Sequence, residues 1–454
     1  MLRINASSLL PRNPQSTRRS FLQVGSLGLT GLSLSSLAKL QAGDQTDPAK
    51  KNNSVILLWL SGGPGHMETW DPKPQAPIEF RGPLTAIKTN VPGIELGELM
   101  PEQAKIMDQL AILRTVNHGT GDHTKGNHWM LTGYEGPAFN APDNRIQRRP
   151  SMGSVASEVL AKNNPGMTPY VAVPHLRGGT DNLFHYSAYL GGGTDPFIVN
   201  SDPNESNYQV RNLTLASNLT LDRLADRKTL LSDLDHYRGS VTNSMKNLDE
   251  HQQAAYELLQ SKKVRDAFDI SLESDSLRDS YGRHTFGQSA LVARRLVEHD
   301  VPFVTVNCVP WDHHGSANRL TLLDGANQLI PPLDIAIAAL VKDLIDRGLY
   351  EKTLVVAMGE FGRTPRVNKD AGRDHWGKTF SVMMGCSSMK MGQVIGKSSK
   401  RGEQVIERPI DPQDVAATIY HHLGINPYTT IFRDYLDRPM PLLDHGTAIQ
   451  ELLG

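Results

Sequence analysis

Two apolar runs joined by a helical pattern constrain the fold of this chain more than any other feature of its sequence. The runs Pro302–Cys308 and Thr353–Met358 have the composition of strands that helices cover on both faces. Between them, apolar residues recur at helical spacing from Leu333 to Ile345; two prolines precede this pattern and Gly348 ends it. A strand, helix and strand in this order form a right-handed crossover between parallel strands. The sequence therefore predicts an α/β fold with a mostly parallel central sheet.

Polar residues follow both strands, and parallel strands bring their carboxyl ends to one edge of a sheet. Asp312 and His314 come after the first strand, and Glu360 comes after the second, in a loop that continues through Arg363 to His375. Carboxylates and imidazoles bind zinc and other divalent ions, and a guanidinium binds tetrahedral oxyanions. The pattern predicts a metal site at this edge. The alternative is that Glu360 forms a structural ion pair with an arginine of the same loop.

Two further predicted strands lead into loops with candidate site residues. Ser54–Leu60 ends in the glycine-rich sequence SGGPGHMETWDPK, in which His66, Glu68 and Asp71 are candidate metal ligands. Asp71 could equally stabilise a turn before Pro72. The run Leu110–Thr115 opens into a loop that carries more ionisable groups than a solvated loop requires, namely His118, Asp122, His123, Lys125 and His128.

The first 42 residues have the pattern of an export signal. Arg18 and Arg19 precede a mildly apolar run from Val24 to Leu37, and Ala42 is a candidate cleavage position. The segment resembles a twin-arginine signal, which is an address read by a receptor and removed after export. The run is too short and too weakly apolar for a spanning helix. We therefore expect a periplasmic or secreted protein without a stable membrane span after processing.

The remaining chain, residues 43–454, is predicted to form a single domain with a helical excursion at about 219–272. A formal net charge of -1 gives no support to nucleic-acid binding. The two cysteines, Cys308 and Cys386, follow or lie within apolar runs and are expected to be buried small side chains. Strand-like residues at Pro169–Pro174 and a helical pattern at Ser289–His299 add further elements to the same α/β arrangement.

Several motifs together carry a resemblance to a known family. The sequences SGGPGHMETWDPK, WMLTG, FGQSALVARRLVEHDVPFVTVN, WDHHG, GEFGRTP, GRDHW and DVAATIYHHLGINP resemble, in order, the bacterial domain-of-unknown-function family numbered 1501. That family is similar to the alkaline phosphatase and sulfatase superfamily. The resemblance implies a three-layer sandwich with a metal site at the carboxyl ends of the strands. It also implies a metal pair from Asp312 and His314, the next carboxylate from Glu360 and a late histidine from His375.

The departures from the superfamily pattern concern the same edge. After the first strand, Ser61 stands where superfamily members have an aspartate, so His66 or Asp71 would have to take its place. At the nucleophile position the chain has His123 and Thr124 in place of a cysteine or serine. A sulfatase mechanism based on formylglycine is therefore not expected.

These observations predict an exported metal-dependent hydrolase of phosphate or sulfate esters. Its cofactor would be a divalent ion, zinc first, with calcium, magnesium or manganese as alternatives. Arg363, Lys125 and Arg373 would neutralise the transferring group, and the attacking group would be water, Thr124 or His123. The substrate would be a small anionic ester or a sulfated or phosphorylated glycan. The alternatives are a non-catalytic exported protein that binds an anionic glycan and a metal with a purely structural role.

Overall fold

The computed structural model describes residues 47, 50, 52–164, 166–176, 183–210, 261–307, 310–315 and 320–453. These residues belong to one compact unit, Thr46–Gly454. The predicted signal segment and most of the predicted helical excursion lie outside the described residues. Of that excursion the structure describes residues 261–272, with the helices α9 (Lys262–Phe268) and η8 (Ile270–Leu272). None of the described helices is both long and apolar enough to cross a bilayer.

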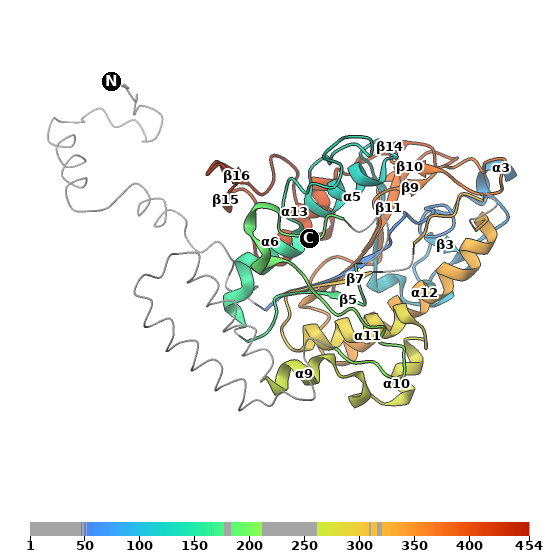
Figure 1. Ribbon diagram of the computed structural model, residues 1–454. Helices are drawn as coiled ribbons and strands as arrows, with labels where there is room; N and C mark the ends of the chain where they lie inside the picture. Colours follow the sequence, from blue (N-terminus) through green and yellow to red (C-terminus); the bar gives the residue numbers. More distant parts are fainter. Residues whose placement is uncertain are drawn as a thin grey trace, which may run out of the picture. The chain divides into compact units, whose positions relative to one another are not determined.

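An eight-stranded sheet forms the centre of the unit, in the order β12-β4-β11-β8-β1-β7-β5-β6 (Figure 1). Strand β1 (Ser54–Trp59) pairs in parallel with β7 (Phe303–Asn307) on one side and with β8 (Thr353–Met358) on the other. Only β11 (Phe380–Gly385) runs against its neighbours in this sheet. The predicted mostly parallel α/β sheet is therefore confirmed. The remaining strands of the sheet are β4 (Ala111–Val116), β5 (Tyr170–Val173), β6 (Phe197–Ile198) and β12 (Gln393–Ile395).

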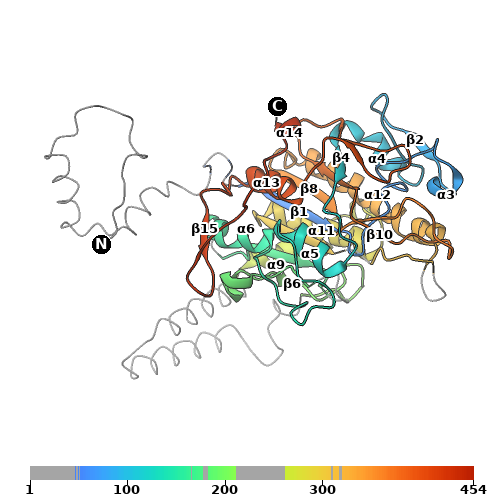
Figure 2. The same ribbon diagram turned by 90° about the horizontal axis from the view of Figure 1, so that it is seen from above.

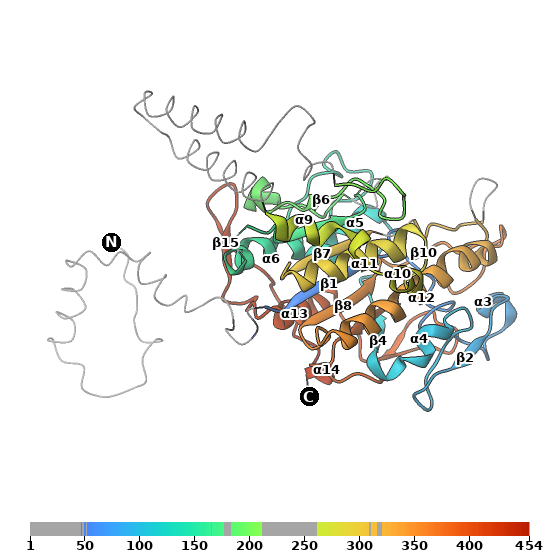
Figure 3. The ribbon, with the colours of Figure 1, turned by 90° about the horizontal axis from the view of Figure 1, so that it is seen from below.

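Helical layers cover both faces of the sheet (Figures 1 and 3). Along β1, Ile56 and Leu58 belong to one apolar core, while Val55 and Leu57 belong to the other, as expected from the alternation of side chains along a strand. The first core is covered by α4 (Pro101–Lys105), α9, α11 (Thr285–Glu298) and α12 (Leu322–Asp346). The second is covered by α5 (His123–Thr132), α6 (Met152–Leu160), α13 (Pro412–His422) and α14 (Gln450–Leu453).

Short hairpins and turns complete the described chain, and several of them gather at one side of the unit (Figure 2). The hairpins are β2–β3 (Ala86–Lys88, Glu95–Gly97), β9–β10 (Gly362–Arg363, His375–Trp376), β13–β14 (Lys397–Ser398, Val405–Glu407) and β15–β16 (Ile431–Arg433, Pro439–Pro441). The short helices are α3 (Ile78–Arg81), α10 (Asp275–Ser280), η3 (Met107–Gln109), η4 (Ala161–Asn163), η5 (Ala188–Leu190) and η6 (Gly192–Thr194).

Helix α12 begins well before the position predicted from its sequence. The two prolines at 331 and 332 lie inside the helix rather than at its start. The true start is fixed by Thr321, whose hydroxyl accepts a hydrogen bond from the backbone N–H of Asp324 at 3.2 Å. Ala326 and Leu329 then extend the buried face of the helix ahead of the prolines. The helix therefore starts at its capping residue and apolar face, although prolines usually occur in the first turn of a helix.

The parallel pairing of β1 with β7 and β8 puts the loops after these three strands at one edge of the sheet. Asp312 lies in the loop after β7, and Glu360 follows β8. The hairpin β9–β10 starts just beyond Glu360 and pairs Arg363 with His375. The fold therefore brings residues far apart in the sequence to the edge where the site was predicted.

Candidate metal centre

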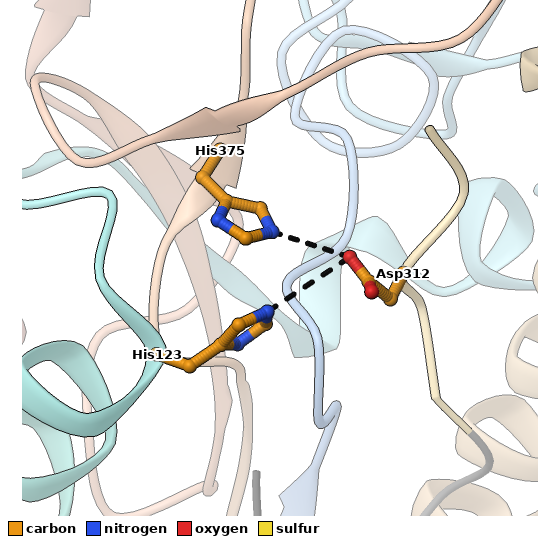
Figure 4. A group of neighbouring side chains, drawn as sticks. All are labelled: His123, Asp312 and His375. Atoms are coloured by element: carbon orange, nitrogen blue, oxygen red, sulfur yellow. Dashed lines mark hydrogen bonds and ion pairs between the residues drawn. The ribbon is translucent and has the colours of Figure 1, made fainter. Parts of the chain in front are cut away.

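Three side chains from three separate segments meet at this edge (Figure 4). His123 is the first residue of α5, whose start is fixed by the Asp122 side chain accepting from the backbone N–H groups of Thr124 and Lys125. Asp312 comes from the loop after β7, and His375 opens β10. One potential ligand atom from each of His123, Asp312 and His375 lies within 4.8 Å of the other two.

The spacing of these atoms suits a small cation. Asp312 Oδ1 lies 3.2 Å from His375 Nε2 and 3.9 Å from His123 Nε2. His314 adds a fourth atom, because its Nε2 lies 2.7 Å from Asp312 Oδ1 and 3.0 Å from His375 Nε2. Tetrahedral zinc with bonds of about 2.0 Å holds its ligand atoms about 3.3 Å apart. Asp312 Oδ1 thus lies 2.7–3.9 Å from one nitrogen atom of each of the three imidazoles, which is near the separation expected of ligands around one ion.

Each histidine of the centre has its Nδ1 atom engaged by an acceptor. A neutral imidazole carries a hydrogen on only one of its two ring nitrogen atoms. A ring that donates through Nδ1 therefore keeps a lone pair on Nε2. The Nε2 lone pairs of His123 and His375 are then available at the same place, as in metal sites whose histidines are oriented by outer partners. The Nε2 atom of His314 lies 3.4 Å from Arg363 Nη1, a donor, as well as beside Asp312. The three pairs are His123 Nδ1 with Glu360 Oε1 at 2.8 Å, His314 Nδ1 with Asp374 Oδ1 at 3.0 Å, and His375 Nδ1 with the carbonyl oxygen of Gly121 at 2.8 Å.

The electrostatic surroundings keep His375 in the neutral form that a metal requires. Burial, followed by the nearby His123 and Arg363, lowers the pKa of His375 to about 3. An imidazole with this pKa is uncharged across the neutral range, so no proton has to leave it before an ion binds.

Glu360, which was predicted to be a metal ligand, lies beside the centre and contacts His123. Its side chain is fully buried, and the backbone N–H of Gly62 lies 2.9 Å and 3.0 Å from its two carboxylate oxygens. Oε1 also lies 2.8 Å from His123 Nδ1, so the carboxylate is placed to orient the His123 ring. Its role as a metal ligand stays a prediction. Gly62 can approach because it has a φ of +96° and because a Cβ atom there would lie 2.8 Å from the backbone nitrogen of Trp311.

Arg363, which was predicted to bind an anion, lies among backbone carbonyl groups in the structure. Its guanidinium is fully buried and donates to three loops: to the carbonyl oxygen of Gly63 at 2.9 Å, of Trp311 at 2.9 Å and of Arg373 at 3.3 Å. It also donates to Asp312 Oδ1 at 3.0 Å. The residue therefore connects the loops that carry the centre, and its guanidinium lies beside both Asp312 and His314.

Comparison with known proteins assigns the chain to a family. Residues 52–453 match the family described as protein of unknown function (DUF1501). The chain belongs to this family. Among curated proteins, none matches this DUF1501 protein. The family membership predicted from the motifs is therefore confirmed.

Solved structures that are similar to this DUF1501 protein include the following three. The PsFucS1 sulfatase from Pseudoalteromonas sp. is 13% identical with a TM-score of 0.36, over 86% of this chain and 72% of the sulfatase. The phosphonate monoester hydrolase of Agrobacterium radiobacter is 13% identical with a TM-score of 0.36, over 88% and 77% of the two chains. A protein in the alkaline phosphatase superfamily from Vibrio parahaemolyticus is 12% identical with a TM-score of 0.37, over 82% and 66%.

Three residues that were predicted to act on the substrate have polar partners outside the centre in this DUF1501 protein. Thr124 is buried, and its hydroxyl lies 2.7 Å from Asp122 Oδ1 and 2.9 Å from the carbonyl oxygen of Pro137. Lys125 Nζ forms an ion pair with Glu135 at 2.6 Å. Arg373 is buried and pairs with Glu68 at 2.6 Å. The polar groups of all three side chains therefore form hydrogen bonds or ion pairs with residues other than the three of the centre.

His66 and Asp71 do not join the centre as substitutes for the missing aspartate. The Nε2 atom of His66 lies 3.0 Å from the carbonyl oxygen of Gly402. Asp71 is fully buried and pairs with Lys73 at 2.7 Å and with Arg114 at 3.2 Å. The ion pairs commit Asp71 to a structural role, and the loop after β1 contributes the backbone N–H of Gly62 to the centre instead.

Asp374 contacts the centre, and the sequence analysis assigned it no role. Asp374 Oδ1 accepts from His314 Nδ1 and, at 3.3 Å, from Asn368 Nδ2. Its position directly before a candidate metal ligand, His375, was the available signal, because carboxylates often orient metal-binding histidines.

Proposed function

We propose that this DUF1501 protein is a metal-dependent hydrolase of phosphate or sulfate esters. His123, Asp312, His314 and His375 would hold one divalent ion, and zinc suits a set of three imidazoles and one carboxylate. The observation that supports this proposal is the convergence of three Nε2 atoms and Asp312 Oδ1 at the carboxyl edge of a parallel sheet. When bound, such an ion polarises an ester oxygen and lowers the pKa of a bound water to about 7.

Water is the attacking group in this proposal. The Thr124 hydroxyl donates within its own loop region, towards Asp122 and Pro137. The Nε2 lone pair of His123 faces Asp312, where it would bind the ion. Neither side chain is therefore placed as a nucleophile, whereas a small anionic ester could approach the ion together with water. Arg363 assists by holding Asp312 in position through the hydrogen bond to Oδ1.

The test combines metal analysis with a screen of aryl phosphates, phosphodiesters and aryl sulfates. Purified protein should contain about one equivalent of metal, and chelation should abolish turnover until the metal is restored. Glu360→Gln should lower metal affinity about 10–100-fold, because the amide no longer fixes His123 as the carboxylate does. Glu135→Gln, on an exposed ion pair, is the matched control and should bind metal normally. Metal-independent turnover of these esters would contradict the proposal.

We also propose that the protein leaves the cytoplasm through the twin-arginine route. The support is the sequence around Arg18 and Arg19. Replacement of both arginines with lysine should leave the protein in the cytoplasm, as measured by cell fractionation. A double variant that is exported like the wild type would show that another signal is used.

A further inference from the structure

The loop that carries His314 packs closely against the turn of the β9–β10 hairpin, residues 364–374. A Cβ atom at Gly372, in this turn, would overlap the carbonyl group of His314. A Cβ atom at Gly315, which follows His314 and has a φ of +76°, would lie 2.7 Å from the backbone nitrogen of Gly372. Only glycine allows so close an approach at these two positions. The position of the His314 main chain therefore depends on how the hairpin turn is held.

One side chain, that of Asn368, connects this turn to His314 and to Asp374. Its Nδ2 group donates to the carbonyl oxygen of His314 at 3.0 Å and to Asp374 Oδ1 at 3.3 Å. Its Oδ1 atom accepts from the backbone N–H groups of Asp370 at 3.0 Å and of Gly372 at 2.9 Å. These partners fix the direction of the amide, because a backbone N–H only donates and a carbonyl oxygen only accepts. The four contacts use the full hydrogen-bonding capacity of an asparagine amide.

The two groups that accept from Asn368 decide where the His314 ring points. One is the main chain that carries the ring. The other is Asp374 Oδ1, which lies 3.0 Å from His314 Nδ1. The side chain of Asp374 is 58% exposed, so packing alone does not fix its carboxylate. A single amide therefore holds both the base of the ring and the acceptor that orients it.

We propose that Asn368 is a positioning residue of the metal centre, which acts by holding the His314 main chain and the Asp374 carboxylate in place. This inference rests on the proposed metal-binding function of the centre. The effect of Asn368 passes through His314, whose Nε2 atom lies 2.7 Å from Asp312 Oδ1. A ligand whose orientation is fixed before an ion arrives loses less conformational freedom when the ion binds.

The first test is the variant Asn368→Asp. It keeps an acceptor oxygen for the N–H groups of Asp370 and Gly372, so the hairpin turn should retain its conformation. It removes the donor to His314 and places a second carboxylate beside Asp374, which like charges disfavour. We expect the zinc affinity, measured by competition with a chromogenic chelator, to fall about 10–100-fold. An affinity equal to that of the wild type would overturn the proposal.

Asn53→Asp is the matched control. Asn53 is also partly buried, and its Nδ2 group donates to the carbonyl oxygen of another histidine, His422, at 2.8 Å. His422 lies at the end of α13 and is not part of the centre. The same substitution should therefore leave the zinc affinity unchanged. Equal losses of affinity in Asn53→Asp and Asn368→Asp would point to general destabilisation and would contradict a positioning role.

A double variant, Asn368→Asp with Asp374→Asn, tests the contact between the two side chains. It exchanges the amide and the carboxylate, so the oxygen at position 374 still accepts from His314 Nδ1 while the new amide donates to the carboxylate at position 368. We expect the double variant to bind zinc about 2-fold or more tightly than Asn368→Asp alone. If the losses of the two single variants simply add, the two side chains do not act together and the proposal is wrong.

A measurement without metal separates this proposal from the proposed function. NMR relaxation of ¹³C-labelled histidine rings reports their mobility on the picosecond to nanosecond scale, and His314→Gln identifies the signal of His314. The His314 ring should be more mobile in metal-free Asn368→Asp than in the wild type, and unchanged in Asn53→Asp. Unchanged mobility in Asn368→Asp would overturn the positioning role. A wild-type protein that binds no zinc would refute the proposed function, and the ring mobility would then decide alone whether Asn368 holds His314.

Discussion

His375→Ala is expected to strip the purified protein of metal and to reduce ester hydrolysis to background. The variant loses one of the four atoms that converge at the centre, and the two nearest to it, Asp312 Oδ1 at 3.2 Å and His314 Nε2 at 3.0 Å, lose a neighbour. Loss of a ligand should exceed the 10–100-fold decrease in affinity that follows loss of an outer partner. Elemental analysis after dialysis against a weak chelator measures the effect, and His314→Ala should give the same result.

The control for this experiment is His421→Ala. His421 lies on α13, where its Nε2 atom is 3.0 Å from Lys50 Nζ and no atom joins the centre. Metal content and turnover should therefore match those of the wild type. Full metal content in both His375→Ala and His314→Ala would refute the proposed ligand set and would favour a structural ion-pair cluster around Asp312.

Arg363→Met is expected to destabilise the whole fold. The methionine fills part of the space but leaves the carbonyl oxygens of Gly63 and Trp311 without their donor, and it leaves Asp312 without a compensating charge. Removing one partner of a buried ion pair costs about 3–5 kcal/mol. The midpoint of urea unfolding should fall accordingly, at unchanged slope.

Arg366→Met is the matched control, because Arg366 is exposed in the same loop. Its effect on the free energy of unfolding should stay within about 0.5 kcal/mol. Wild-type stability of Arg363→Met would mean that the guanidinium is not needed to hold the loops. In that case Arg363 would again become a candidate for binding the anionic part of a substrate.

The strands that position the centre could be predicted because their signals are local. The runs that became β1, β7 and β8 are short, apolar and followed by turn residues, and the helical pattern between the last two requires parallel pairing. Strand β11 is equally apolar, but its direction depends on how it pairs with β4 and β8, which periodicity does not encode. The antiparallel strand was therefore beyond a prediction from the sequence.

The roles of the site residues were harder to predict than their positions. Asp312, His314 and His375 were assigned correctly to one edge, since strand topology alone brings them there. The contact of Glu360 with His123 depends on the close approach of Gly62 to Trp311, which directs the Gly62 N–H at the Glu360 carboxylate. Distances of this kind follow from packing among distant segments, and residue types and spacing do not reveal them.

The central place of β1 in the sheet also affects how the protein is made. Both partners of this strand, β7 and β8, belong to the second half of the described chain, so ribosomes complete them long after β1 has emerged. At about 5–20 residues per second, an interval of roughly 250 residues lasts about 10–50 seconds. During that time the apolar strand SVILLW has no partner on either edge and is prone to aggregate. Production of this protein should therefore depend on chaperones that hold the nascent chain until β7 and β8 are available.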